Sequence, residues 1–435
     1  MKTKPKQKIN IITMGCSKNL VDSEQLMRQL NDKYEVIHES EKEDADIIII
    51  NTCGFIADAK QESIDTILNF SEAKKTGKIK KVYVMGCLSQ RYKKELTAEM
   101  PEVDAFYGVN DLSALLQTLE VDLKKQLLGE RMLTTPSHYA YLKISEGCNR
   151  NCSFCAIPLI RGKNISKPIE DLLAEAEWLV KQGVKEIILI AQDLTYYGMD
   201  LYKKRKLAEL LEKLASIKGL EWIRLHYAYP AAFPMDVLHV MAKYDNICKY
   251  LDIPLQHINT DILTSMKRNI DTAKTKELVA KMRKLVPEIS IRTTLIVGYP
   301  GETFAQFEEL KRFVAESKFE RLGVFTYSPE ENTTAYLLKD NVSAKTKEKR
   351  LAEIMELQQL ISAEINTAKI GKVYKTIIDR EEGDYWIGRT EFDSPEVDNE
   401  VLILKKGNKL KKGNFYSVKI TNAEDYDLLG EVVEN

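Results

Sequence analysis

Short apolar runs alternate along the first third of the chain with stretches in which apolar residues recur every three or four positions. The runs are typical of buried strands, and the longer period is typical of helices that bury one face. We expect strands at residues 8–13, 34–38, 46–51, 81–85 and 104–107, and helices at 23–30 and 56–70. Residues 47–50 are all isoleucine, which favours a strand covered on both faces. The alternation predicts a doubly wound parallel sheet for residues 1–135.

The same alternation continues from residue 136 to residue 367. Six strand-like segments, each followed by helical sequence, lie at 141–144, 186–191, 222–227, 250–253, 290–296 and 321–327. Residues 169–181 have the amphipathic period of a helix that packs one face on a sheet. Six strand–helix units predict a partial (β/α)6 barrel, in which the active site lies at the carboxyl ends of the strands.

The last part of the chain has a different pattern. After a charged helix expected at 344–368, short apolar stretches lie at 372–378, 385–389, 400–404, 415–421 and 427–433, separated by turn-forming sequence. Five short strands of this kind predict a small antiparallel β-barrel that is OB-like. We therefore expect an α/β protein with three domains, at residues 1–135, 136–367 and 368–435.

The composition is that of a globular protein, with 44% hydrophobic and 30% charged residues among 435. A formal net charge of −1 gives no general attraction for nucleic acid or for an anionic membrane. Purely aliphatic runs such as residues 47–50 are too short to span a bilayer, and the basic amino terminus leads into a strand without an apolar signal core. These features predict a cytoplasmic protein with no membrane partner.

Three of the seven cysteines stand close together, at Cys148, Cys152 and Cys155. The spacing C-x3-C-x2-C on a short loop allows the three thiolates to close on one face of a metal centre, one ligand short of a closed tetrahedral site. Thiolates select zinc, copper(I) or iron–sulfur clusters, and an incomplete set leaves one position open for a substrate. The alternatives are three unrelated buried cysteines, or a zinc loop that borrows a distant fourth ligand.

A second set of cysteines, Cys16, Cys53 and Cys87, lies far upstream. Each follows an expected strand and stands beside a glycine, which lets the backbone turn sharply or approach closely. The carboxyl ends of parallel strands meet at one edge of a sheet, where ligands bind. We therefore predict a second three-thiolate site with a free coordination position, the alternative being three separately buried structural cysteines. Cys248 stands alone and is expected to be a small buried hydrophobe.

The central cysteine spacing, with Phe154 before its third cysteine, resembles the signature of the radical S-adenosylmethionine superfamily. Together with the segments Gly15–Glu24, Asn51–Gly54 and Gly86–Cys87 and a terminal barrel of the TRAM kind, it is similar to the radical methylthiotransferases over essentially the whole chain. One branch of that family modifies tRNA adenosine, and the other modifies an aspartate of a small-subunit ribosomal protein. The second branch is the better match at four stretches: Lys18-Asn19, 224–230, 251–257 and 425–432.

The resemblance implies two 4Fe–4S clusters and S-adenosylmethionine as cofactors. Cys148, Cys152 and Cys155 would hold the cluster that binds and reductively cleaves S-adenosylmethionine, giving a 5′-deoxyadenosyl radical that abstracts hydrogen from an unactivated carbon. Cys16, Cys53 and Cys87 would hold an auxiliary cluster that carries the sulfur to be methylated and transferred. The implied activity is methylthiolation of the β-carbon of an aspartate in a basic ribosomal protein, free or in the ribosomal subunit. The implied electron donor is a low-potential protein such as flavodoxin or ferredoxin.

The resemblance also suggests side chains and loops that contact S-adenosylmethionine. They are Phe154 in the cysteine loop, Gln192 and Asp193 after the second barrel strand, and Gly298, Pro300 and Gly301 after the fifth. Ordinary turn formation is the alternative for the last two groups, because Pro-Gly is a strong turn signal in any protein. Arg292 would either bind a carboxylate or form a structural salt bridge, and His257 is expected to be a structural histidine.

The charge of the terminal barrel bears on the substrate. Residues 370–435 carry ten Lys and Arg and fourteen Asp and Glu, a net charge of −4. An acidic surface suits a basic ribosomal protein, whereas a tRNA-binding barrel is expected to be basic. A group of lysines at 405, 406, 409, 411 and 412 is an exception, and is either a contact for ribosomal RNA or a solvated hairpin. Two alternatives therefore stay open: tRNA adenosine methylthiolation, and a non-catalytic RNA-binding scaffold whose cysteines hold structural zinc.

Overall fold

The computed structural model describes residues 6–40, 45–127 and 129–433. The chain divides into two compact units, each with most of its contacts within itself. The first contains residues 1–135, 141–150 and 156–178, and the second contains residues 136–140, 151–155 and 179–435. Among the described helices, none is both long enough and apolar enough to cross a membrane.

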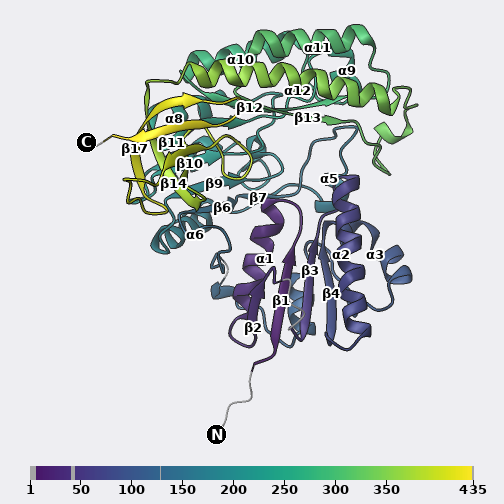
Figure 1. Cartoon of the computed structure of the whole chain (residues 1–435). Helices are drawn as coiled ribbons and strands as arrows, with labels where there is room; N and C mark the ends of the chain where they lie inside the picture. Colours follow the sequence, from purple (N-terminus) through teal and green to yellow (C-terminus); the bar gives the residue numbers. More distant parts are fainter. Residues whose placement is uncertain (1–5, 41–44, 128, 434–435) are drawn as a thin grey trace. The chain divides into compact units, whose positions relative to one another are not determined.

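A parallel sheet of five strands forms the centre of the first unit, with the strand order β2-β1-β3-β4-β5. Strands β2, β1, β3 and β4 are labelled in Figure 1. Its strands are β1 (Lys8–Thr13), β2 (Glu35–His38), β3 (Ile47–Thr52), β4 (Lys81–Gly86) and β5 (Ala105–Phe106). The order reverses between β1 and β3, which are neighbours and lead to helices on opposite faces of the sheet. This is the predicted doubly wound arrangement.

Two cores cover the two faces of this sheet, and the isoleucines of β3 alternate between them. Ile47 and Ile49 pack in one core, with α1 (Ser17–Leu30) and α4 (Leu112–Thr118). Ile48 and Ile50 pack in the other, with α2 (Ala57–Lys75) and α3 (Cys87–Glu99). Successive side chains of a strand point to opposite faces, so an unbroken isoleucine run requires a helical layer on each side.

The first helix is longer than predicted. It begins at Ser17 rather than at residue 23, and Lys18 and Asn19 in its first turn are buried. These buried positions are polar, so the apolar period that marks the rest of the helix does not extend to them.

A six-stranded sheet with the order β13-β12-β11-β10-β9-β6 follows the order of the sequence. Its strands are β6 (Tyr139–Lys143), β9 (Glu186–Ile190), β10 (Trp222–Leu225), β11 (Ile247–Asp252), β12 (Ser290–Val297) and β13 (Arg321–Thr326). The connecting helices are α6 (Ile169–Lys181), α7 (Leu207–Ala215), α8 (Met235–Lys243), α10 (Thr272–Leu285) and α11 (Phe304–Ser317). The pairs from β9 to β13 are parallel, which confirms the predicted partial (β/α)6 barrel.

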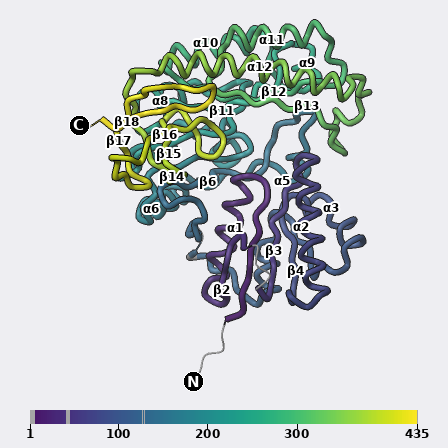
Figure 2. The backbone as a smooth tube through the Cα atoms, viewed as in Figure 1, coloured from purple at the N-terminus to yellow at the C-terminus, as the bar shows by residue number. Residues whose placement is uncertain are grey.

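The long helix α12 (Ala344–Thr367) leads to a closed barrel of five strands, whose path can be followed in Figure 2. The strands are β14 (Val373–Glu382), β15 (Tyr385–Thr390), β16 (Val401–Leu404), β17 (Phe415–Ala423) and β18 (Leu428–Val432). The barrel is antiparallel as predicted except where β16 pairs with β18 in parallel. Strands of an odd number cannot alternate in direction all the way round a closed ring, so one parallel pair is unavoidable.

Buried ion pairs within the second unit attach this barrel to the six-stranded sheet. The carboxylate of Glu186 on β9 accepts hydrogen bonds from Arg224 Nε on β10 at 2.7 Å and from Arg389 Nη2 on β15 at 2.6 Å. Burial opposes ionisation of Glu186, but the two guanidinium groups lower its pKa below the usual value. Arg389 also binds Asp379 on β14, with 2.7 Å between Nε and Oδ2. The barrel is thus joined to the sheet by charges that have no access to water.

Replacing Glu186 with alanine tests this attachment. We expect a loss of about 3–5 kcal/mol in the free energy of unfolding, measured in urea, because two buried guanidinium groups lose a common partner. The matched control is Glu221→Ala, since Glu221 pairs with Lys375 of the same barrel at 2.8 Å but both side chains are about half exposed. That control should cost less than about 1 kcal/mol. Equal losses in the two variants would contradict the buried attachment.

Candidate functional site

The cysteines of the first set lie at one edge of the parallel sheet in the first unit. Cys16 follows β1, Cys53 follows β3, and Cys87 follows β4 as the first residue of α3. These are the carboxyl ends of three adjacent strands, on both sides of the point where the strand order reverses. Open parallel sheets bind their ligands at this point.

Three glycines allow the cysteine-bearing segments to pack against one another. A Cβ added at Gly15, whose φ is +90°, would lie 2.9 Å from Cys53 Sγ. A Cβ at Gly54 would lie 2.8 Å from the carbonyl carbon of Cys87, and one at Gly86, with φ +101°, would lie 2.6 Å from the Thr52 oxygen. Each glycine beside a cysteine is therefore required by a close approach, as the sequence predicted.

Asn19 fastens these segments together. Its Nδ2 donates to the carbonyl oxygens of Met14 at 2.8 Å and Thr52 at 3.1 Å, which immediately precede Gly15 and Cys53. The backbone carbonyl oxygen of Asn19 accepts a hydrogen bond from Asn51 Nδ2 at 2.9 Å. Asn19 belongs to the Lys18-Asn19 stretch in the sequence, but no structural role was predicted for it. Its position in the first turn of α1, three residues after Cys16, was the signal available in the sequence.

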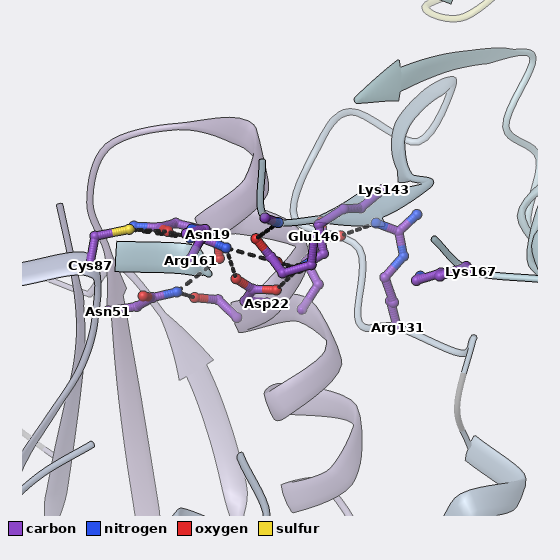
Figure 3. Close-up of polar contacts among 12 residues, drawn as sticks. Asn19, Asp22, Asn51, Cys87, Arg131, Lys143, Glu146, Arg161 and Lys167 are labelled. Carbon is purple, nitrogen blue, oxygen red and sulfur yellow. Dashed lines mark hydrogen bonds and ion pairs between the residues drawn. The ribbon is translucent and has the colours of Figure 1, made fainter. Parts of the chain in front are cut away.

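A group of polar and charged residues extends from Cys87 to one side, as Figure 3 shows. Arg161, at the end of α5 (Ile157–Arg161), donates from Nη2 to Cys87 Sγ at 3.4 Å and also to Asn19 Oδ1. Its Nη1 donates to Asp22 at 3.1 Å and to Glu146 at 2.9 Å. Sequence reasoning missed Arg161, because its partners Cys87 and Asp22 lie 74 and 139 residues away.

Burial controls the ionisation of two of the three thiols. Cys16 is exposed, whereas Cys53 and Cys87 are buried. Burial raises the pKa of Cys53, and raises the pKa of Cys87 to about 11 despite the nearby Arg161 guanidinium. Metal ligation requires thiolates, so a cation is needed to hold these two side chains ionised at neutral pH. An iron–sulfur cluster, helped by Arg161, fits that requirement.

Among the residues that the structure describes, no three His, Cys, Asp or Glu side chains are grouped as ligands of a single metal ion. A 4Fe–4S cluster makes a different demand, because each thiolate binds its own iron and the thiolates stand apart. The arrangement of Cys16, Cys53 and Cys87 on separate strand ends agrees with that demand.

The second set of cysteines lies on one loop between β7 (Ser145–Glu146) and α5. Cys148 falls in the first unit, whereas Cys152 and Cys155 fall in the second. The backbone N–H of Cys148 donates to the Gly162 oxygen at 3.0 Å. Gly147, with φ +78°, permits this approach, since a Cβ there would lie 2.2 Å from the Lys163 oxygen.

Within the second unit, Cys152 is held by two side chains that sequence reasoning did not single out. Arg268 Nη1 donates to Cys152 Sγ at 3.4 Å, and the hydroxyl of Tyr229 lies 3.9 Å from the same sulfur. The Arg268 guanidinium stacks over the Tyr229 ring at 4.3 Å from its centroid.

The loop of Gly298, Pro300 and Gly301 lies next to this part of the cysteine loop through Tyr299, which the prediction omitted. Phe154 packs with Tyr299 in one apolar cluster. The hydroxyls of Ser153 and Tyr299 are 2.9 Å apart. The structure therefore brings two segments predicted to bind S-adenosylmethionine together, while the ligand contacts of their individual residues stay a prediction.

Glu302 stabilises the loop of Gly298, Pro300 and Gly301. Its carboxylate accepts a hydrogen bond from the Gly298 N–H at 2.8 Å and pairs with Arg350 at 2.8 Å. Burial raises the pKa of Glu302 despite Arg350. His257 is also buried there, and burial together with Arg350 lowers its pKa to about 3, so its imidazole is neutral at physiological pH. This agrees with a structural histidine.

Asp193 ends a turn after β9 and caps the short helix η2 (Leu194–Tyr196), accepting from the Thr195 N–H at 2.8 Å. This hydrogen bond is the ordinary turn formation that was the alternative to ligand binding for Asp193. A contact from Gln192 or Asp193 to S-adenosylmethionine stays a prediction. Arg292 forms ion pairs with Asp252 at 3.6 Å and Asp398 at 3.3 Å, the structural alternative for this residue.

Cys248 is fully buried beside Trp222 and Tyr250. Burial raises its pKa to about 12, so the thiol stays protonated at neutral pH. The expected small buried hydrophobe is confirmed.

Three regions of the chain match known protein families. Residues 8–108 match the uncharacterized protein family UPF0004, residues 142–314 match the radical SAM superfamily, and residues 370–433 match the TRAM domain. With the partial barrel and the cysteine loop, these matches define a radical S-adenosylmethionine enzyme, a class that uses an iron–sulfur cluster and S-adenosylmethionine.

Curated relatives identify the family within this class. Proteins from Christiangramia forsetii and Flavobacterium johnsoniae are 59% and 58% identical over 435 residues, and one from Cytophaga hutchinsonii is 56% identical over 430. Each match covers 99% of this chain and 96–100% of the relative. All three are described as ribosomal protein uS12 methylthiotransferase RimO. The chain belongs to the RimO family, which confirms the predicted branch of methylthiotransferases.

Solved structures support the fold alone. The radical S-adenosylmethionine methyltransferase TsrM from Kitasatospora setae, with tryptophan and a SAM analogue bound, aligns with a TM-score of 0.58 at 12% identity, covering 83% of this chain and 90% of that one. The cobalamin-dependent radical enzyme OxsB aligns with a TM-score of 0.52 at 12% identity, covering 81% and 56%.

Gly86→Ala tests the packing of the first cysteine set. Gly77 is a matched control, because its φ is +78° but no atom lies within 4 Å of an added Cβ. Gly77→Ala should cost about 1–2 kcal/mol in the free energy of unfolding of the apo-protein, from backbone strain alone. Gly86→Ala should cost about 1–3 kcal/mol more, because the methyl group also collides with the β3 backbone. Equal costs, measured in urea, would show that the segments at Cys53 and Cys87 do not depend on this close approach.

Proposed function

We propose that this protein transfers a methylthio group to the β-carbon of an aspartate in ribosomal protein uS12. The observation that carries the proposal is the near full-length similarity to relatives described as uS12 methylthiotransferases, at 56–59% identity. The two sets of three cysteines agree with it, because this chemistry needs one site to cleave S-adenosylmethionine and another to hold the sulfur.

Cys148, Cys152 and Cys155 would hold the cluster that binds S-adenosylmethionine and supplies the electron for its reductive cleavage. The chain contributes Arg268, whose guanidinium donates to Cys152 Sγ. Phe154 and Tyr299 pack together in one apolar cluster. Gln192, Asp193, Gly298, Pro300 and Gly301 are the proposed contacts to S-adenosylmethionine, since they lie at the carboxyl ends of β9 and β12.

Cys16, Cys53 and Cys87 would hold a second cluster, which carries the sulfur before its methylation and transfer. Support comes from their common sheet edge, from the glycines that pack their segments, and from Asn19, which ties the loops of Cys16 and Cys53 together. The buried thiols also need a cation to ionise. The electron donor in this proposal is a low-potential protein such as flavodoxin or ferredoxin.

The charge of the barrel supports a protein substrate. Its residues 370–435 have a net charge of −4, which attracts a basic ribosomal protein and repels the tRNA backbone. Transfer to tRNA adenosine is the competing outcome of the following experiment.

The test is an anaerobic assay of the reconstituted enzyme with S-adenosylmethionine, sulfide and reductant. A peptide carrying the uS12 aspartate loop and, separately, unmodified tRNA are the acceptors, and mass spectrometry reads the products. We expect a methylthio adduct on the aspartate only. An adduct on tRNA only would overturn the proposed substrate, and cleavage of S-adenosylmethionine without either adduct would point to another acceptor.

Single cysteine variants separate the two sites in the same assay. Cys152→Ala should abolish cleavage of S-adenosylmethionine, with 5′-deoxyadenosine falling at least about 1000-fold, because the electron source is lost. Cys16→Ala should retain cleavage but lose the methylthio product. Cys248→Ala is the control, since Cys248 lies in an apolar core, and it should keep both activities. Methylthio transfer by Cys16→Ala at the wild-type rate would contradict a sulfur-carrying role for the first set.

A further inference from the structure

Arg161 occupies an unusual position for a charged residue. It ends the short helix α5, which begins two residues after Cys155, and its side chain is almost completely buried. Ala156 and Ile160, from the same segment, pack with Cys87 in an apolar cluster. The segment that directly follows the central cysteine loop therefore packs against Cys87, a predicted ligand of the other cluster.

The two ends of the Arg161 guanidinium contact different kinds of partner (Figure 3). Nη1 faces the carboxylates of Asp22 and Glu146, at 3.1 and 2.9 Å. Nη2 faces Cys87 Sγ at 3.4 Å and the Asn19 side-chain oxygen. Because the group is planar and rigid, the carboxylates on one side fix the direction in which the other side donates.

Charge neutralisation alone does not explain this arrangement. Lys143 already contacts both carboxylates, with its Nζ 2.7 Å from Glu146 and hydrogen-bonded to Asp22. With Arg161 included, two cations face the two carboxylates, whose side chains are 15% and 21% exposed. That balance involves only Nη1 of Arg161, whereas Nη2 is directed at the Asn19 oxygen and the Cys87 sulfur.

We propose that Arg161 is a positioning residue for the second cluster: it fixes the Cys87 sulfur and, by donating a hydrogen bond to it, raises the reduction potential of the cluster held there. Donors to a ligand sulfur withdraw electron density and stabilise the reduced cluster, and such outer-shell contacts are a main means by which proteins tune potentials. This inference rests on the proposed function, because it requires a cluster at Cys16, Cys53 and Cys87.

The experiment uses the full chain with Cys148, Cys152 and Cys155 all changed to alanine, so that iron can load only at the first set. Potentiometric titration followed by electron paramagnetic resonance then reads one cluster. Arg161→Met in this background should shift its potential to a lower value, and Arg161→Lys, which keeps the charge, should restore part of the shift.

Arg131→Met is the matched control. Arg131 is another buried arginine of the first unit, and its ion pairs are with the carboxylates of Glu24 at 3.1 Å and Glu175 at 3.4 Å. Its loss should lower stability while leaving the cluster potential unchanged. A general effect of removing a buried guanidinium would move the potential in both variants, and would overturn the proposal.

The remaining outcomes are also decisive. An unchanged potential in a loaded Arg161→Met protein overturns the inference and leaves the proposed function intact. Absence of iron from the triple-alanine background with Arg161 in place removes the second cluster, and the proposed function fails instead. If Arg161→Met alone does not retain iron, Arg161→Gln is titrated: a lower potential, or loss of iron while Arg131→Met loads, supports the positioning role, and a wild-type potential overturns it.

Discussion

The direction of the strands determines where chemistry can occur in this protein. Parallel strands all end at one edge of the sheet. The loops that lead from the strands into the following helices therefore gather at that edge. In the first unit the edge carries Cys16, Cys53 and Cys87. In the second unit, the ends of β9 and β12 carry Gln192 and the loop from Gly298 to Gly301. The same topological rule therefore positions both candidate sites, although their folds differ.

Buried charge is the second common feature of the two units. Arg161 lies among carboxylates beside a thiol, and Glu186 joins two guanidinium groups beneath the terminal barrel. A buried charge is tolerated only when its partners are fixed by the surrounding fold. These networks consequently require an accurate arrangement of segments that are distant in the sequence, and apolar packing alone does not specify such an arrangement.

That distinction explains what could be predicted from the sequence. The strands of both sheets followed from apolar runs, and Cys16, Cys53 and Cys87 could be placed at strand ends because each directly follows such a run. Asn19, Arg161 and Tyr299 were missed, since polar contacts over long sequence distances leave no periodic signal. The first turn of α1 was also missed, because its buried residues Lys18 and Asn19 are polar and give no apolar period. The parallel β16–β18 pair follows from closure of the barrel, a property that no single segment displays.

The spacing of the two cysteine sets has a consequence for the order in which the protein matures. Cys148, Cys152 and Cys155 lie within eight residues, so even a largely unfolded chain can gather them at small entropic cost. Cys16, Cys53 and Cys87 are separated by 37 and 34 residues, and they meet only when β1, β3 and β4 have paired. The cluster proposed for the first set would therefore be inserted into a sheet that has already folded, in which Cys16 is exposed. In that proposal, iron would reach the first set only after folding, whereas it could reach the central loop earlier.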